Sequence, residues 1–280
     1  MISVQLNFDL NTLCFLPGVN MLRHLTISML LLMAPLKSSY SCFEKIDNKS
    51  IDQRNDSSKI SHREFNEIVD AARIMFVEKA ASENISLNLT GYWDSPVINA
   101  YTLVIGNSAS ISIYGGIAKA TSLTSEGLAL ALCHELGHVL GGEPYFGDFN
   151  NSVEGGADYY STRHCLKEFL TVLNLPPSDN LTPDISKICS FDKDELLCQQ
   201  VLVGGLSVMT ELSKMSPNGN TELSYYTPDS TISPTTLKSY PSFQCRLDTI
   251  LRGYLNLSRP SCWFNENDPN NHADSDVITI

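Results

Sequence analysis

The sequence predicts an α+β protein that is mainly helical and contains a small sheet. Segments that alternate apolar and polar residues, as half-buried strands do, are confined to residues 85–114. Longer segments with apolar residues at helical spacing come before and after them. The chain has 280 residues and a hydrophobic content of 42%, which is enough to bury one good core.

Residues 21–41 have the pattern of an export signal. A short basic region precedes a twelve-residue apolar run at 25–36, and small residues stand three and one positions before Cys42. Because this run is too short to span a membrane, we expect a cleaved signal peptide and no transmembrane helix in the mature chain. An uncleaved anchor is the alternative. Residues 1–20 show no such pattern, and we interpret them as lying upstream of the true start.

Cys42, the first residue of the expected mature chain, is also a candidate for a lipid anchor. Ser39 does not match the aliphatic residue expected three positions before a lipoprotein cysteine, which disfavours lipid attachment. With or without the anchor, we expect an exported protein that resides in the periplasm, in the cell envelope or outside the cell.

The predicted domain begins after a polar linker. Residues 42–60 are rich in Asn, Asp, Ser and Lys, and we expect the compact domain to extend over residues 61–262. It opens with a helix at about 61–81, where apolar residues recur at helical spacing. Strands are expected at residues 85–92, 102–105 and 109–114.

The next helix, expected at residues 125–140, carries the motif His134-Glu135-Leu136-Gly137-His138, which has the form H-E-x-x-H. A hydroxyl residue at 124 or 125 can cap its start, and two glycines follow its end. On a helix the two histidines stand one turn apart on the same face and can bind one Zn²⁺. Glu135 lies one step round the helix, where it can act as a general base without binding the metal.

A further helix is expected at residues 152–173. Within it, Glu154 and Asp158 stand four positions apart and therefore share a face. A zinc hydrolase needs three protein ligands and an open fourth position, and Glu154 can supply the third ligand beside the two histidines. Asp158 can accept the remaining N–H of a ligand histidine and so orient its ring.

These motifs resemble those of the gluzincin metallopeptidases, and among them the HtpX and CAAX-prenyl-endopeptidase-like family, which pairs H-E-x-x-H with E-x-x-x-D on the next helix. Asn99-Ala100 and residues 111–117 are similar to that family's Asn-Ala pair and strand-to-glycine segment. The resemblance covers about residues 99–165 and implies a zincin-like fold, a Zn²⁺ cofactor and a peptide or protein substrate. The chain differs from the membrane-embedded members in its extra cysteines and in lacking transmembrane helices around the motifs.

In gluzincins the strand before the metal helix is an exposed edge of the sheet, and extended substrate pairs with it. The resemblance therefore places a peptide along residues 109–114, at Ile111 and Ser112. The alternative interpretation is a sheet edge that binds nothing.

The C-terminal half is expected to alternate helices with long loops. Prolines at 176, 177 and 183 predict a loop after the second metal helix. Helices are then expected at 192–215 and 244–255. The segment between them is rich in Pro, Ser, Thr and Tyr and is long enough to cover a cleft. Residues 263–280 are expected to form an acidic, disordered tail.

Six of the eight cysteines follow Cys42, and in an exported protein they predict up to three disulfides, with fifteen connectivities open. Helical geometry turns Cys133 away from the histidine face and places Cys165 about 16 Å beyond Glu154. We therefore interpret both as structural residues rather than zinc ligands. The donor that stabilises the oxyanion is left open among four residues: Tyr225, Tyr226, Tyr240 and Arg246.

The function predicted from these features is that of an exported zinc endopeptidase in which Glu135 activates water. The composition is acidic, with 31 Asp+Glu against 19 Lys+Arg, which argues against nucleic acid as a partner. The alternative from another class is a non-catalytic zinc-binding or assembly protein that retains the fold. An intact Glu135 speaks against that alternative, because binding alone does not need this carboxylate.

Overall fold

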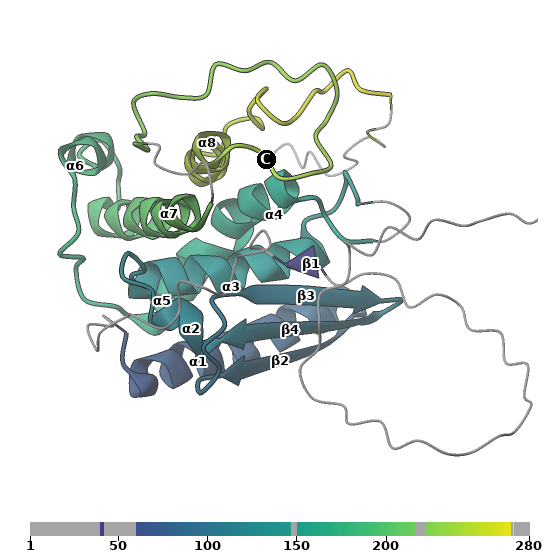
Figure 1. Cartoon of the computed structure of the whole chain (residues 1–280), viewed down its shortest axis with the longest axis vertical. Helices are drawn as coiled ribbons and strands as arrows, with labels where there is room; N and C mark the ends of the chain where they lie inside the picture. The colour runs from purple at the N-terminus through teal and green to yellow at the C-terminus, as the bar shows by residue number, and fades with distance from the viewer. Residues whose placement is uncertain (1–39, 42–59, 147–149, 217–221, 270, 272–280) are drawn as a thin grey trace, which may run out of the picture. The chain divides into compact units, whose positions relative to one another are not determined.

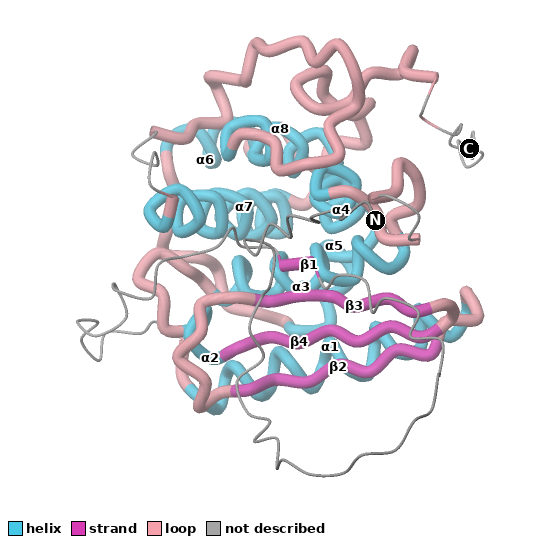
Figure 2. The backbone as a smooth tube through the Cα atoms, turned by 45° about the vertical axis from the view of Figure 1, so that its right-hand side comes forward, coloured by secondary structure: helices cyan, strands magenta, loops and turns pink. Residues whose placement is uncertain are grey.

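The computed structural model describes residues 40–41, 60–146, 150–216, 222–269 and 271. As predicted, the protein is α+β, and helices predominate over one small sheet (Figure 1). The sheet and α1 (His62–Ser82) lie on one side of a central helix, α3 (Ser125–Leu140). The remaining long helices lie on the other side of α3, as the backbone trace in Figure 2 also shows.

The sheet has the strand order β1-β3-β4-β2. β3 (Ala100–Ile105) and β4 (Ser108–Tyr114) form an antiparallel hairpin whose turn contains Gly106 at a positive φ of 57°. β2 (Ser86–Tyr92) runs parallel to β4 on its other side. The two-residue β1 (Tyr40–Ser41) pairs antiparallel with β3. The three predicted strands are therefore confirmed, and β1 falls at the end of the expected signal peptide.

The prediction that residues 109–114 form an edge strand is wrong, because β4 lies in the middle of the sheet. It is paired along its whole length with β2 on one side and with β3 on the other. The physical reason is burial: Ile111 and Ile113 have no exposed surface, and their apolar side chains are best removed from water at the centre of the sheet. A peptide therefore cannot pair with the main chain of Ile111 or Ser112.

The central helix α3 has the predicted bounds. Thr124 caps its start by accepting the main-chain N–H of Gly127 at 3.1 Å. Every residue from Glu126 to Val139 is buried, because the sheet and α1 cover one side of the helix while other helices cover the rest. The H-E-x-x-H motif consequently lies inside the protein core and not on an amphipathic surface.

The predicted helix at 152–173 is interrupted by a π-helical turn. It consists of α4 (Glu154–Tyr160), the turn η3 (Ser161–Cys165) and α5 (Leu166–Leu173). The two later helices are present within a few residues of their predicted bounds, as α7 (Glu195–Met215) and α8 (Phe243–Tyr254).

Two short helices, α2 (Gly115–Ala118) and α6 (Pro183–Cys189), were not predicted. Pro183 had suggested a loop, but in α6 it occupies the first turn, where a missing N–H costs nothing. The side chain of Thr182 caps this helix by accepting the N–H of Ile185 at 3.3 Å. From Ser224 to Ser242 the chain forms no helix or strand, in agreement with the predicted loop.

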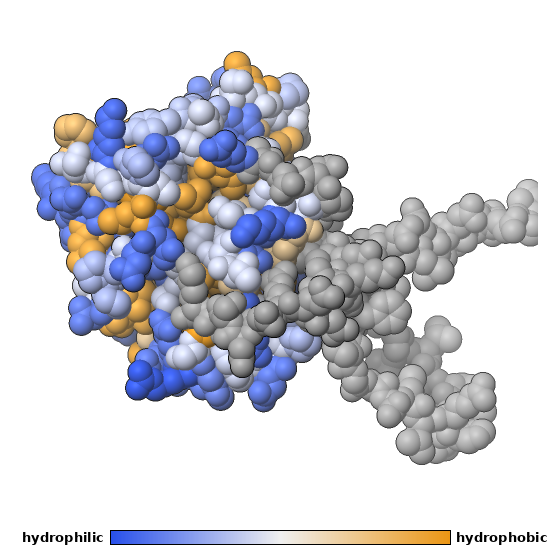
Figure 3. Space-filling view, turned by 60° about the vertical axis from the view of Figure 1, so that its left-hand side comes forward, coloured by the Kyte–Doolittle hydropathy of each residue, from blue (hydrophilic) through white to orange (hydrophobic). Residues whose placement is uncertain are grey.

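In the described part of the chain, α7 is the one helix that is long and apolar enough to cross a membrane. Because 72% of its apolar window is buried inside the protein, we interpret it as a core helix. On the face of the molecule shown in Figure 3, apolar residues gather in patches between charged ones. The most exposed large apolar residues lie far apart in the chain, as isolated surface apolar residues ordinarily do: Ile74 on α1, Phe191 after α6 and Ile232 in the loop before α8.

Three disulfides confirm the cysteine prediction. Cys133–Cys165 joins α3 to η3, Cys189–Cys198 joins α6 to α7, and Cys245–Cys262 joins α8 to the C-terminal segment. Cys133 and Cys165 are structural, as expected. Three bridges in one chain indicate an oxidising environment outside the cytoplasm.

The prediction of a disordered tail from residue 263 is wrong for its first residues. Trp263 is fully buried, and its carbonyl accepts the N–H of Leu237 at 2.8 Å. Asp268 is also buried and accepts the N–H of Thr236 at 2.7 Å. The apolar pair Cys262 and Trp263 anchors this segment, which overall composition does not reveal. The structure does not describe residues 1–39, residues 42–59 or most of the tail after Asp268. The signal peptide, the polar linker, the lipid anchor at Cys42 and the disorder of the last residues therefore stay predictions.

Candidate metal centre

The residues of the H-E-x-x-H motif and of α4 meet because the two helices approach closely. A Cβ atom at Gly137 would lie 2.6 Å from the carbonyl oxygen of Ala157, so only glycine permits this crossing. Gly137 is one of the two unspecified positions of the motif. Its small size lets the first turn of α4 reach the two histidines, and Glu154 is the first residue of that helix.

His134, His138 and Glu154 form a group that could hold a metal ion. Nε2 of His134 lies 3.4 Å from Oε2 of Glu154, and Nε2 of His138 lies 3.6 Å from Oε1. Two ligand atoms that each bind a tetrahedral Zn²⁺ at about 2.0–2.1 Å stand about 3.4 Å apart. The two histidine-to-glutamate separations therefore suit one shared ion, and all three ligand atoms lie within 4.8 Å of one another.

Burial supports the same interpretation. The three residues are only 2–5% exposed. Among the described residues, Nε2 of His138 has no hydrogen-bond partner, and it lies 3.6 Å from Oε1 of Glu154. Buried polar atoms are rarely left without a partner, so this nitrogen is available to bind a metal ion.

The second nitrogen of each histidine is held by a specific acceptor. Nδ1 of His134 lies 2.7 Å from Oδ1 of Asp158, which is the role predicted for this carboxylate. Nδ1 of His138 lies 2.7 Å from the main-chain carbonyl of Ser152. A carbonyl can only accept, so Nδ1 of His138 carries the proton and Nε2 presents its lone pair to the centre. No side-chain pattern could have revealed Ser152, because it acts through its main chain.

Arg246 on α8 is the one candidate donor that the structure brings to the centre. It is 2% exposed and makes two hydrogen bonds to Asp158, from Nε at 2.7 Å and from Nη2 at 2.9 Å. Nη2 also lies 3.3 Å from Oε2 of Glu154. The other candidates differ: the hydroxyl of Tyr225 donates to the carbonyl of Leu202 at 2.7 Å, and two further tyrosines are more than two-fifths exposed, Tyr226 and Tyr240.

The charges around the centre keep its carboxylates ionised. Burial by itself would raise the pKa of Glu154, but the hydrogen bond from His134 and the charge of Arg246 outweigh burial and lower it. Burial opposes ionisation of Asp158 in the same way, and Arg246 and His134 hold the pKa of that carboxyl well below its usual range. Ionised oxygens are the form that binds a cation.

Glu135 has no exposed surface and contacts a residue that the sequence did not single out. Oε2 of Glu135 accepts a hydrogen bond of 2.6 Å from the hydroxyl of Thr102, which lies on the inner face of β3. The sequence carries only a weak signal for this contact, because Thr102 is a polar residue at an inward-facing position between the apolar residues Ala100 and Val104.

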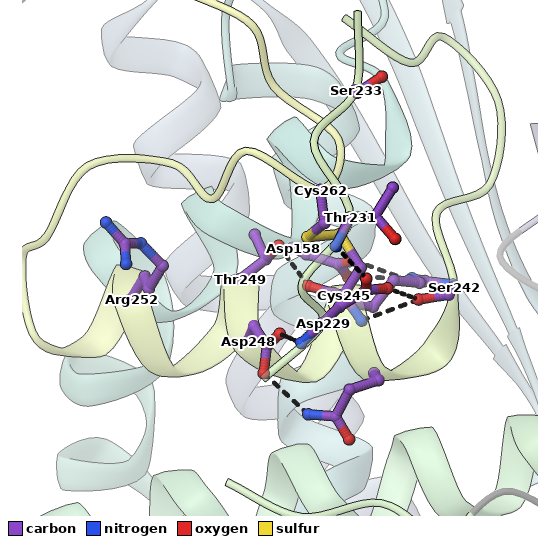
Figure 4. The surroundings of a disulfide bond; sticks show 12 residues. Asp158, Asp229, Thr231, Ser233, Ser242, Cys245, Asp248, Thr249, Arg252 and Cys262 are labelled. Carbon is purple, nitrogen blue, oxygen red and sulfur yellow. Dashed lines mark hydrogen bonds and ion pairs between the residues drawn. A yellow bond between two sulfur atoms is a disulfide. The ribbon is translucent and has the colours of Figure 1, made fainter. Parts of the chain in front are cut away.

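A second cluster of metal-binding residue types, Asp229, Cys245 and Cys262, is not a metal site, because its two sulfur atoms are bonded to each other (Figure 4). Figure 4 also shows that this disulfide lies at the start of α8, close to Asp158.

Comparisons of the chain with protein-family models, with curated proteins and with solved structures find no match. The protein is therefore defined by its own fold and site: an α+β protein, stabilised by disulfides, with a buried His-His-Glu group that could hold a metal ion.

Proposed function

We propose that the protein is an exported zinc-dependent endopeptidase of the gluzincin type. The observation that carries the proposal is the arrangement of His134, His138 and Glu154 around one point, with Glu135 on the next position of the same helix. Two imidazoles and one carboxylate are a donor set of catalytic zinc sites, which keep a fourth position open. Structural zinc sites are instead usually closed by four Cys or His ligands.

Each residue of the centre has a distinct task in this mechanism. Bound at these three ligands, Zn²⁺ would polarise the scissile carbonyl and lower the pKa of a coordinated water to about 7. Glu135 accepts the proton of the attacking water as its oxygen bonds to the carbonyl carbon, and passes that proton to the amine as the C–N bond breaks. Asp158 and the carbonyl of Ser152 hold the histidine rings in the ligating tautomer.

The substrate strand belongs on β3 rather than on β4. β3 is the strand whose side chain reaches Glu135, and its outer edge pairs with β1 at Tyr101 and Thr102. An extended peptide in the place of β1 would form the same antiparallel ladder beside the catalytic base. Cleavage of the signal peptide after Ser41 would remove β1 and leave this edge to the substrate.

The alternative is a zinc-binding protein without turnover, and the depth of the centre favours it. Glu135 has no exposed surface and the three ligands have very little, whereas a hydrolase must admit a peptide. The two functions differ in what Glu135 does, and this difference provides the test.

The experiment measures metal content and casein cleavage in the purified, oxidised protein, with and without a chelator. We expect about one zinc per chain and cleavage that the chelator abolishes. Glu135→Gln should keep its zinc and lose roughly 10²-fold or more in cleavage. Glu154→Ala should lose the zinc itself. Glu126→Gln is the matched control, because it removes another buried carboxylate of α3.

The outcomes separate the candidates. If the unmodified protein binds zinc but does not cleave casein, the alternative function, a zinc-binding protein without turnover, is supported. A chain that binds no zinc excludes both functions.

A further inference from the structure

We propose that Thr102 is a positioning residue for Glu135, and that its hydroxyl sets the orientation of the carboxylate that serves as the base. This inference rests on the proposed function and adds a residue from the sheet to a site otherwise built on helices.

The geometry selects the carboxylate as the acceptor. Oγ1 of Thr102 lies 2.6 Å from Oε2 of Glu135 and 3.0 Å from the main-chain oxygen of the same residue. A hydroxyl has one hydrogen to donate, and 2.5–2.7 Å is the usual length of a hydrogen bond from a hydroxyl to a carboxylate. Thr102 therefore donates to Oε2, and the main-chain oxygen is its second neighbour.

The hydroxyl itself is held rigidly. Thr102 pairs with Ile111 of β4, and this hairpin pairing does not depend on the signal peptide. It has no exposed surface, and a β-branched side chain in a strand has few rotamers. A glutamate side chain is much more flexible, so the rigid partner determines where the carboxylate points.

A purely structural role would not require a hydroxyl at this position. The inward-facing neighbours of Thr102 on β3 are Ala100 and Val104, and valine would fill nearly the same volume without a polar atom. The hydroxyl of Thr102 donates instead to the side chain of Glu135, the residue proposed as the base. General bases must be held within about 0.5 Å of the productive position, which a charge-assisted hydrogen bond achieves.

The first experiment compares Thr102→Val with Thr102→Ser in the exported, oxidised protein, using an internally quenched fluorescent peptide as substrate. We expect Thr102→Val to keep its zinc, to lower kcat about tenfold and to leave KM within about twofold, because the loss falls on the chemical step. Thr102→Ser should recover activity to within about threefold, since it restores the donor.

The matched control is Thr162→Val. Thr162 is also fully buried, and its hydroxyl makes a long-range hydrogen bond of 2.9 Å, in this case to the carbonyl of Ile250. Thr162→Val should change the free energy of unfolding about as much as Thr102→Val does, and it should leave kcat unchanged.

The second experiment does not depend on turnover. Acetohydroxamate ligates a metal ion while a neighbouring base accepts its proton, and the visible absorption of the Co²⁺-substituted protein reports its binding. Thr102→Val should weaken acetohydroxamate binding about fivefold or more in the unmodified chain. In the Glu135→Ala background it should have no effect, because no carboxylate remains to be oriented.

The results distinguish this inference from the function on which it rests. A chain that takes up no metal overturns the metal centre and the inference together. A metal-loaded chain in which Thr102→Val cleaves peptide and binds acetohydroxamate like the unmodified protein overturns the inference alone. Equal losses from Thr102→Val with and without Glu135 would also overturn it, because they would show a purely structural effect.

Discussion

The guanidinium of Arg246 makes two hydrogen bonds to the carboxylate of Asp158, at 2.7 and 2.9 Å, although 88 positions separate the two residues. Asp158 in turn lies 2.7 Å from Nδ1 of His134. This chain of contacts ties α8 to the metal helix through α4. The orientation of a proposed zinc ligand therefore depends on a helix near the C-terminus.

Replacing Arg246 should damage both the fold and the metal centre. Arg246→Met leaves two buried carboxylates, Asp158 and Glu154, without their cation, which typically costs about 3–5 kcal/mol. Zinc affinity should fall about 10–100-fold, as it does when the partner of a ligand is lost. Urea unfolding and zinc competition measure the two effects.

Arg63→Met is the control for this substitution, because it removes an exposed ion pair with Glu67 and should change stability little. Arg246→Lys should recover only part of the loss, because lysine cannot make the two-pronged contact. Unchanged stability and unchanged zinc affinity in Arg246→Met would contradict the proposed role of the ion pair.

The metal-free protein should become less stable in acid. The pKa values of Asp158 and Glu154 are lower in the folded protein than their usual values, despite burial. Such groups contribute stability that is present above the unfolded-state pKa, about 3.9 for Asp and 4.3 for Glu, and is lost as the pH falls towards the folded-state pKa. The free energy of unfolding should therefore decline below about pH 4.

Asp158→Asn provides the comparison for this acid dependence. The variant should be less stable at neutral pH and should lose less of its remaining stability in acid, because it lacks one of the groups that must be protonated. Urea unfolding of both metal-free proteins between about pH 2 and pH 7 measures the slopes. If the free energy of unfolding falls equally steeply with decreasing pH in both proteins, Asp158 contributes nothing to the loss of stability in acid.

Two adjacent glycines of α4 should respond in opposite ways to alanine. A Cβ atom at Gly155 would lie 2.3 Å from the ring of Trp263, so Gly155→Ala must displace the first turn of α4, which carries Glu154. At Gly156 the nearest atom would be 3.5 Å away, an ordinary contact. Gly156→Ala should be tolerated or stabilising by about 0.5–1 kcal/mol, because alanine is the better helix former.

Thermal unfolding and zinc titration of the two glycine variants test this contrast. Gly155→Ala should lower both the melting temperature and zinc affinity, whereas Gly156→Ala should lower neither. Equal behaviour of the two variants would show that Trp263 does not hold the first turn of α4 in place.

Loss of the Cys133–Cys165 disulfide should destabilise the protein more than loss of Cys189–Cys198. The two bridges close segments of 32 and 9 residues. In the chain-entropy model the bridge that closes the longer segment stabilises the protein by about 1 kcal/mol more than the other. Paired Cys→Ala variants compared by urea unfolding give the difference. A larger loss from the shorter bridge would indicate that packing, not chain entropy, dominates.

The residue spacings that define the candidate centre could be read from the sequence because helical geometry is local. The 3.6-residue period places His134 and His138 on one face, and Glu154 and Asp158 on another, wherever those helices lie in the fold. The caps and stops of α3 are also short-range signals, and its predicted bounds are correct. For the same reason the three strands with alternating residues were located within a few positions.

Only the tertiary structure decided which distant residues meet these local motifs. Thr102 reaches Glu135 from a strand 33 positions away, and Arg246 reaches Asp158 from the last helix. The central place of β4 and the anchoring of Trp263 were likewise mispredicted. In each case the local pattern is compatible with several arrangements. The choice among them depends on apolar burial summed over the whole core, which no short stretch of sequence contains.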